Sequence, residues 1–189
     1  MKLGKTLYVK DRKAWRAWLS KHYSTAKEIW LIYYKKASGK PRIPYNDAVE
    51  EALCFGWIDS TAKGIDSEKF AQRFSPRRRT SILSQLNKER VRKLIASKKM
   101  TAAGLNAIAH AYKSKADHRK EHVSKAVLAA LKKNPAAWKN FQKLPEAYKR
   151  IRLAYIGHQG ERDRQTFRKV LGHFVKMTAQ NKRFGHMTG

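Results

Sequence analysis

Apolar and polar residues recur along this chain with two different periods. Near the N-terminus Trp15, Trp18, Leu19 and His22 have the spacing of one helix face. Asp11, a residue type that caps helices well, is expected to begin this helix. The next run, Glu28–Lys35, is short, continuous, aromatic and β-branched, which predicts a buried strand. A turn is expected at Ser38–Pro41.

A second helix is predicted to begin at Asn46 as its N-cap and to bury Val49, Ala52 and Leu53. Gly56 stands where a glycine commonly ends a helix. Two strands then follow, joined through residues 66–68: Trp57–Ile65 and Phe70–Ser75. Pro76 is expected to end their pairing.

From Ser84 onward every apolar pattern is helical. The predicted buried faces are Leu86, Val91, Leu94 and Ile95; then Leu105, Ile108 and Tyr112, with Thr101 as the cap; then Val123, Val127, Leu128 and Leu131; and last Phe167, Val170, Leu171, Phe174 and Val175. Pro135 and Pro145 are placed at helix starts. Residues 113–120 are polar without a period and are the best candidate for a linker.

These elements predict an α+β fold. Its N-terminal half has a small antiparallel or mixed sheet with two helices, and a basic helical C-terminal half follows. We expect residues 1–112 to form an α+β core and residues 113–189 to form a basic helical subdomain packed on that core.

The charge of the chain is one-sided, with 43 Lys and Arg against 14 Asp and Glu, a net of +29. Residues 1–68 carry 13 basic and 8 acidic residues, whereas residues 69–189 carry 30 and 6. Such a field attracts polyanions, either nucleic acid or an anionic membrane surface, and it equally serves solubility alone. The densest basic patch is Arg77, Arg78, Arg79, Lys88, Arg90, Arg92 and Lys93. Since no nucleic-acid-binding motif accompanies it, any nucleic-acid binding is expected to be non-specific and salt-dependent.

Location follows from the apolar runs. The longest, from Ile29 to Tyr34, is far too short to span a bilayer. The basic N-terminal stretch is not followed by the apolar run of a secretion signal. We therefore expect a cytoplasmic protein without a transmembrane segment.

A small polar site is predicted on the first hairpin. Trp57 and Asp59 alternate along one strand, so both point to the same face, and we expect Arg73 and Ser75 on the partner strand to reach that face. An aspartate beside an arginine and an aromatic ring can bind a ligand. The same residues can equally be a cross-strand ion pair beside a core tryptophan, and the sequence leaves both interpretations open.

Two other features are weaker candidates for chemistry. Cys54, the single cysteine, excludes an intrachain disulfide, and it is expected to be a buried, inert thiol. His118–His122 matches the H-x-x-E-H pattern of some zinc enzymes, but its lysine-rich surroundings favour a solvated helix start. No metal and no cofactor is predicted.

Several segments carry a resemblance to a known family: Ala52–Asp59 (ALCFGWID), Arg73–Arg77 (RFSPR), Asn87–Arg90 (NKER) and Met100–Gly104 (MTAAG). Together they resemble the bacterial and archaeal YdeI/OmpD-associated proteins, the bacteriocin-protection family, over roughly residues 8–180. The resemblance implies a link to resistance against cationic antimicrobial peptides and bacteriocins. It implies no established reaction.

Three hypotheses of function remain open. The first is a stress- or bacteriocin-protection-type protein that binds a ligand or partner around Trp57, Asp59, Arg73 and Ser75. The second is a non-specific binder of nucleic acid or another polyanion through the patch that begins at Arg77. The third is a small-molecule enzyme centred on Trp57 and Asp59, with Asp59 as its acid or base.

Overall fold

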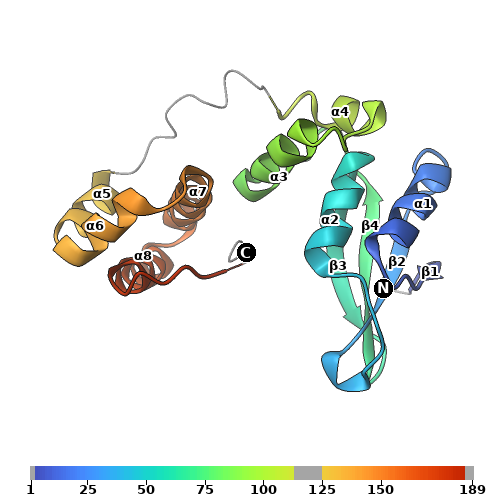
Figure 1. The fold of residues 1–189 in the computed structure, drawn as a ribbon, viewed down its shortest axis with the longest axis horizontal. Coiled ribbons are helices and arrows are strands. Elements are labelled where there is room, and N and C mark those ends of the chain that lie inside the picture. Colours follow the sequence, from blue (N-terminus) through green and yellow to red (C-terminus); the bar gives the residue numbers. More distant parts are fainter. Residues whose placement is uncertain (1–2, 113–124, 186–189) are drawn as a thin grey trace. The chain divides into compact units, whose positions relative to one another are not determined.

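The computed structural model describes residues 3–112 and 125–185 of the chain, which fall into two compact units (Figure 1). The N-terminal unit is Met1–Lys113 and the C-terminal unit is Ser114–Gly189. The predicted α+β fold is confirmed. The packing of the C-terminal part on the core stays a prediction.

One four-stranded mixed sheet forms the base of the N-terminal unit. Its strands are β1 (Thr6–Leu7), β2 (Ile29–Tyr34), β3 (Trp57–Gly64) and β4 (Lys69–Pro76), in the spatial order β1-β2-β4-β3. The first pair is parallel and the other two pairs are antiparallel. The three longer strands were predicted; β1 has two residues, too few to show a period.

Two helices, α1 (Arg12–His22) and α2 (Tyr45–Cys54), bury their apolar faces in the core of this unit, beside the inward residues of the sheet. Figure 1 shows both helices next to the strands. The core contains Trp15, Leu19, Leu31, Val49, Leu53, Trp57 and Phe74. A short 3-10 helix, η1 (Lys36–Ser38), leads out of β2, while α3 (Gln85–Ala96) and α4 (Ala102–Ile108) both contact α2.

The helix ends confirm most of the predicted caps. Asp11 accepts a hydrogen bond from the amide of Ala14, and Thr101 accepts one from the amide of Gly104. Gly56 has a φ of +75°, the left-handed conformation expected of a glycine that ends a helix. Asn46 as an N-cap was wrong.

The second helix instead begins at Tyr45, with Pro44 in the cap position. Proline fixes its own φ near the helical value, but its side chain has no acceptor for the first amides of the helix, so α2 begins without a side-chain cap. The side chain of Asn46 is thereby free to bond elsewhere, and it accepts a hydrogen bond from Arg90.

The C-terminal unit, in its described part, is helical and has its own core. Its helices are α5 (Lys125–Lys132), α6 (Pro135–Lys143), α7 (Glu146–Arg162) and α8 (Arg164–Ala179), and the first three all contact α8. The core is built from Val127, Leu131, Ala137, Phe141, Tyr148, Ile156 and Phe174. Pro135 opens α6 and Pro145 directly precedes α7, as predicted.

Some predicted faces are narrower than the sequence pattern. Ile95 is 40% exposed and Leu105 is 41% exposed, because α3 and α4 bury only the side that turns toward the core. The predicted linker at residues 113–120 lies outside the described residues. In the described ranges no helix combines the length and apolar character that a membrane crossing needs.

Candidate functional site

The four residues of the predicted ligand site do not share one face of the sheet. In the antiparallel pair β3–β4, Asp59 stands opposite Phe74, and residues opposite each other point to the same side. Trp57 and Asp59 therefore lie on the side of the core residue Phe74, under the helices. Arg73 and Ser75, the neighbours of Phe74 in sequence, point to the other side. The prediction that Arg73 and Ser75 reach the face of Asp59 was wrong. Asp59 pairs with Phe74 and not with either neighbour of Phe74, and a shift of one residue in register moves a side chain to the opposite face.

Arg73 is bonded to a different acid. Its Nε and Nη2 donate to Glu28 Oε2 at 2.7 and 2.6 Å, and the indole of Trp30 donates to Glu28 Oε1 at 3.1 Å. The Arg73 and Trp30 hydrogen bonds hold the pKa of Glu28 below its ordinary value. Arg73 thus makes an ion pair on the outer face of the sheet.

Trp57 is part of the core. Its side chain is 1% exposed, its indole nitrogen donates to the carbonyl of Tyr23 at 3.1 Å, and its ring meets Trp18 edge-on at 5.8 Å. A tryptophan that is so completely buried stabilises the core beside Asp59, and its ring is not accessible to a ligand.

Asp59, in contrast, lies in a polar environment at the edge of that core. It is half-buried at a bulge, since the register of β3 against β4 shifts between Asp59 and Ala62. The hydroxyl of Tyr45 donates to Asp59 Oδ2 at 2.5 Å. Tyr45 is 41% exposed, so this pair is the part of the site that solvent can reach.

Two arginines are buried close to this pair. Arg90 is 6% exposed, and its two terminal nitrogens donate to Asn87 Oδ1 at 2.8 Å and to Asn46 Oδ1 at 2.6 Å. The N-cap Ser84 starts α3 and so places Arg90 on the buried side of that helix. Neutral amides thus satisfy two donors of Arg90 and leave its charge in place.

Arg77 is the other, 8% exposed, and it is positioned by the strand end, because its own amide donates to the carbonyl of Gly56. Its Nη1 donates to the carbonyls of Ser81 and Ile82 at 3.5 and 3.1 Å. Its Nε and Nη2 are buried and have no hydrogen-bond partner. Such orphaned donors are rare in folded proteins and call for an explanation.

Electrostatics joins these side chains into one group. Burial lowers the pKa of both Arg77 and Arg90; the carboxylate of Asp59 opposes that effect on Arg77, and the carboxylate of Glu50, followed by Tyr45 and Asp59, opposes it on Arg90. Burial also raises the pKa of Tyr33 and of Tyr45, and Asp59 adds to both shifts. The hydroxyl of Tyr33 is buried without a partner. We refer to Tyr33, Tyr45, Asp59, Arg77 and Arg90 as the Asp59 cluster.

The cluster contains two guanidinium groups and one carboxylate, so its ordinary charge is positive. Sequence reasoning named Asp59 for this site but assigned the two arginines to a surface patch, and it missed both tyrosines. Asn46 and Arg90 are 44 positions apart in the sequence, so no local signal indicates that their side chains meet.

The predicted polyanion patch is divided by the fold. Arg77 and Arg90 are buried, and Nη1 of Arg92 is bonded to Glu89. Lys88 is half-buried, and three members are exposed: Arg78, Arg79 and Lys93. The seven residues therefore do not make one exposed surface, and binding of a polyanion stays a prediction.

Cys54 is buried, as predicted, and burial raises the pKa of its thiol, which makes it a poor nucleophile. Its carbonyl accepts two bonds from Thr101, one from the amide and one from the hydroxyl. A Cβ on Gly104 would lie 2.2 Å from the same carbonyl oxygen, so this contact needs glycine. Two segments of the family resemblance, around Cys54 and around Thr101, thus form one packing contact.

Metal chemistry finds no support among the residues that the structure describes, where no group of three or more His, Cys, Asp or Glu could hold an ion. The H-x-x-E-H segment at residues 118–122 lies outside them.

Two family models match the chain. Residues 7–107 match a domain of unknown function (DUF8412), and residues 122–181 match the family described as bacteriocin-protection, YdeI or OmpD-associated. Neither the curated proteins nor the solved structures contain a match. The predicted family is therefore confirmed at the C-terminal segment, whereas the segments from Ala52 to Gly104 lie within the other match. The chain belongs to the DUF8412 family through its N-terminal half and carries a YdeI/OmpD-associated segment in its C-terminal unit.

Proposed function

We propose that the N-terminal unit is a ligand-binding module that takes the phosphate or carboxylate group of a small molecule at the Asp59 cluster. One observation carries the proposal: the guanidinium of Arg77 is buried and two of its nitrogens, Nε and Nη2, have no partner. An oxyanion would accept from both.

The energetics favour such an acceptor. A buried donor without a partner costs about 1–3 kcal/mol, and more when it is charged. Hydrogen bonds from arginine to an oxyanion are among the strongest in proteins, and the planar guanidinium fits two oxygens at once. Arg77 already uses Nη1 to hold the carbonyls of Ser81 and Ile82, so its position is fixed before any ligand arrives.

The accessible side of the cluster is the pair of Tyr45 and Asp59. The Tyr45 hydroxyl donates to Asp59, which leaves the second carboxylate oxygen able to accept from a hydroxyl or amine of a ligand. A small molecule with an anionic group and a neighbouring donor would therefore match the cluster best.

The C-terminal segment indicates a protein of the bacteriocin-protection type with an unknown mechanism. A net charge of +29 repels cationic peptides, so direct capture of such a peptide is unfavourable. We therefore propose that protection is indirect: the protein binds an anionic small molecule in the cytoplasm and does not bind the peptide itself. Catalysis by Asp59 and non-specific nucleic-acid binding remain separate hypotheses.

Calorimetric titration of the full chain with inorganic phosphate at physiological ionic strength tests the proposal. Arg77→Met and Arg78→Met each remove one cation, but Arg78 is exposed and outside the cluster. We expect Arg77→Met to abolish phosphate binding and Arg78→Met to leave it nearly unchanged. Equal effects of the two variants would show that phosphate senses only the overall charge.

Asp59→Asn provides an arm that does not depend on Arg77→Met being folded. It removes the carboxylate that repels an anion, so phosphate should bind about fivefold more tightly, the equivalent of ~1 kcal/mol of repulsion. Unchanged or weaker phosphate binding by a folded Asp59→Asn variant would contradict a site beside Asp59.

A further inference from the structure

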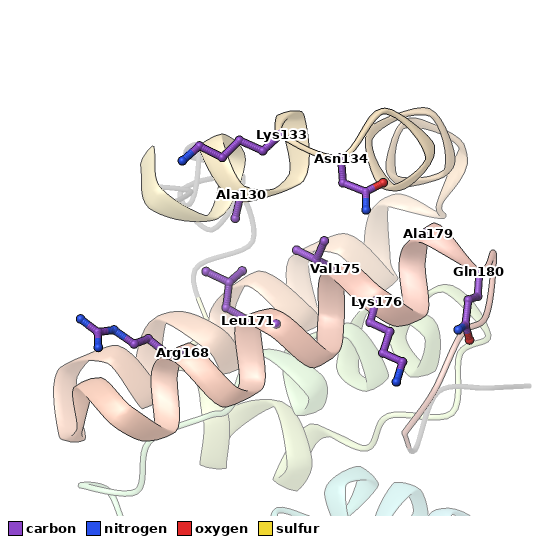
Figure 2. A pocket seen from close by; sticks show the side chains of 10 residues that line it. Ala130, Lys133, Asn134, Arg168, Leu171, Val175, Lys176, Ala179 and Gln180 are labelled. Atoms are coloured by element: carbon purple, nitrogen blue, oxygen red, sulfur yellow. The ribbon is translucent and has the colours of Figure 1, made fainter.

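A groove of about 600 Å³, open to solvent on one side, crosses the C-terminal unit between α8 and the α5–α6 connection (Figure 2). It is lined by Ala130, Lys133, Asn134, Arg168, Leu171, Gly172, Val175, Lys176, Ala179 and Gln180. All of these residues belong to one unit, and none is part of the Asp59 cluster.

The floor of the groove is a helical stripe. Leu171 and Val175 of α8 are half-buried, and in Figure 2 they point toward Ala130 and Asn134. From Arg168 to Ala179 successive lining residues of α8 are separated by three positions and one position in turn, which is the spacing of one helix face over three turns. Two small residues on that face, Gly172 and Ala179, let another backbone come close. A stripe with this spacing is the kind of surface on which a second helix packs.

The border of the groove is cationic. Lys133, Arg168 and Lys176 line it together with two amides, and no lining residue is acidic. The surrounding unit has the same sign, since residues 125–185 contain 15 basic and 3 acidic side chains. An occupant that brings acidic residues to this border would be attracted, and a basic one would be repelled.

We propose that this groove docks an acidic amphipathic helix of a partner protein. Apolar residues of that helix, spaced at three and four positions, would lie on Leu171 and Val175, while Asp or Glu on its flanks would face Lys133, Arg168 and Lys176. Small-molecule sites usually enclose most of their ligand. Because this groove is open on one side, it suits a helix better than a small molecule. A second copy of α8 is disfavoured as the occupant, since it brings the same cations.

Fluorescence anisotropy of the full chain with a labelled synthetic peptide tests this proposal. The probe is an acidic amphipathic peptide of about 14 residues, roughly 21 Å long as a helix. A peptide of the same composition, with its apolar residues scattered, is the control for charge. We expect the first to bind and the second to bind at least tenfold more weakly.

Two matched pairs of variants place the binding in the groove. A Cβ added at Gly172 or at Gly157 has no atom within 4 Å apart from its chain neighbours and the backbone of its own helix, so we expect both helices to tolerate leucine, which also has the higher helix propensity. Gly172→Leu fills the groove and should weaken peptide binding at least tenfold, whereas Gly157→Leu, on α7, should not change it. Lys176→Glu should weaken binding more than Lys169→Glu, an equal change of charge at an exposed position outside the groove.

Absence of peptide binding, or equal effects within either pair, would overturn the proposal. Phosphatidylglycerol vesicles provide a further arm. If they bind the chain, and Gly172→Leu abolishes that binding while the peptide fails to bind, the groove serves a membrane surface and the proposed helix is wrong.

Discussion

The two units use their basic residues in opposite ways. In the N-terminal unit several arginines are paired with a buried acid or are buried themselves: Arg12 and Arg16 both bond to Glu51, which is 2% exposed, and Arg77 and Arg90 are buried. In the C-terminal unit few acids are available, and cations such as Lys133, Arg168 and Lys176 border an open groove. The +29 charge is therefore not one surface property: part of it is buried or paired in one unit, and part of it borders an open groove in the other.

The largest expected effect concerns the core that supports the Asp59 cluster. Trp57→Ala removes a side chain that is 1% exposed and should destabilise the chain by about 4 kcal/mol, as large-to-small changes in a packed core do. Trp138→Ala, at a half-buried position of the C-terminal unit, should cost less. Urea denaturation measures both. A cost below ~1 kcal/mol for Trp57→Ala would mean that Trp57 is available to a ligand after all.

The pairing of arginines with a buried acid predicts the next effect. Glu51→Gln removes the buried carboxylate that Arg12 and Arg16 share. It should cost about 2 kcal/mol of unfolding free energy, as the loss of hydrogen bonds to a charged group does, because both arginines are partly exposed and Arg12 keeps Asp47 and Glu50. Glu146→Gln changes an acid that is 71% exposed and paired with Lys149. It should change stability by less than ~0.5 kcal/mol. Similar losses for the two variants would remove the distinction between the units.

The smallest effect is a pH dependence on the outer face of the sheet. The pKa of Glu28 is lowered in the fold, so its ionised form stabilises the protein above the unfolded pKa, and this is lost as pH falls through the folded pKa. Glu28→Gln should therefore cost less than ~1 kcal/mol near neutral pH, because the pair with Arg73 is partly exposed. The difference in unfolding free energy between this variant and the wild type should disappear as pH drops below about 4. Thermal unfolding across pH measures it, and a gap that widens in acid would contradict the assigned direction.

Much of the fold was predictable because its signals are local. The continuous apolar run of β2 and the caps Asp11 and Thr101 each depend on a few neighbouring residues. Asn46 was misassigned as a cap because the helix begins one residue before it, at Tyr45, with Pro44 in the cap position. The face of Arg73 was misassigned because strand register is set by pairing partners that the sequence does not show.

The candidate sites were less predictable for a related reason. Arg77 and Arg90 looked like surface cations in a basic run, and only tertiary packing buries them. The stripe from Phe167 to Val175 predicted an amphipathic α8, but a pattern of apolar residues cannot tell which of them find a partner within the fold. Of these residues Phe174 is buried, whereas Phe167, Val170, Leu171 and Val175 are half-buried against the core, and Leu171 and Val175 are the two that also line the groove.

We propose that the two unpartnered donors of Arg77, Nε and Nη2, bind an oxyanion. Nuclear magnetic resonance of the arginine Nε–Hε groups during a phosphate titration of the full chain tests it most directly, with Arg77→Met identifying the resonance. We expect the Arg77 signal to move first and to saturate, while that of Arg78 moves little and without saturation. A titration in which phosphate shifts the signals of the exposed arginines and leaves the Arg77 signal unchanged would contradict an oxyanion site at Arg77.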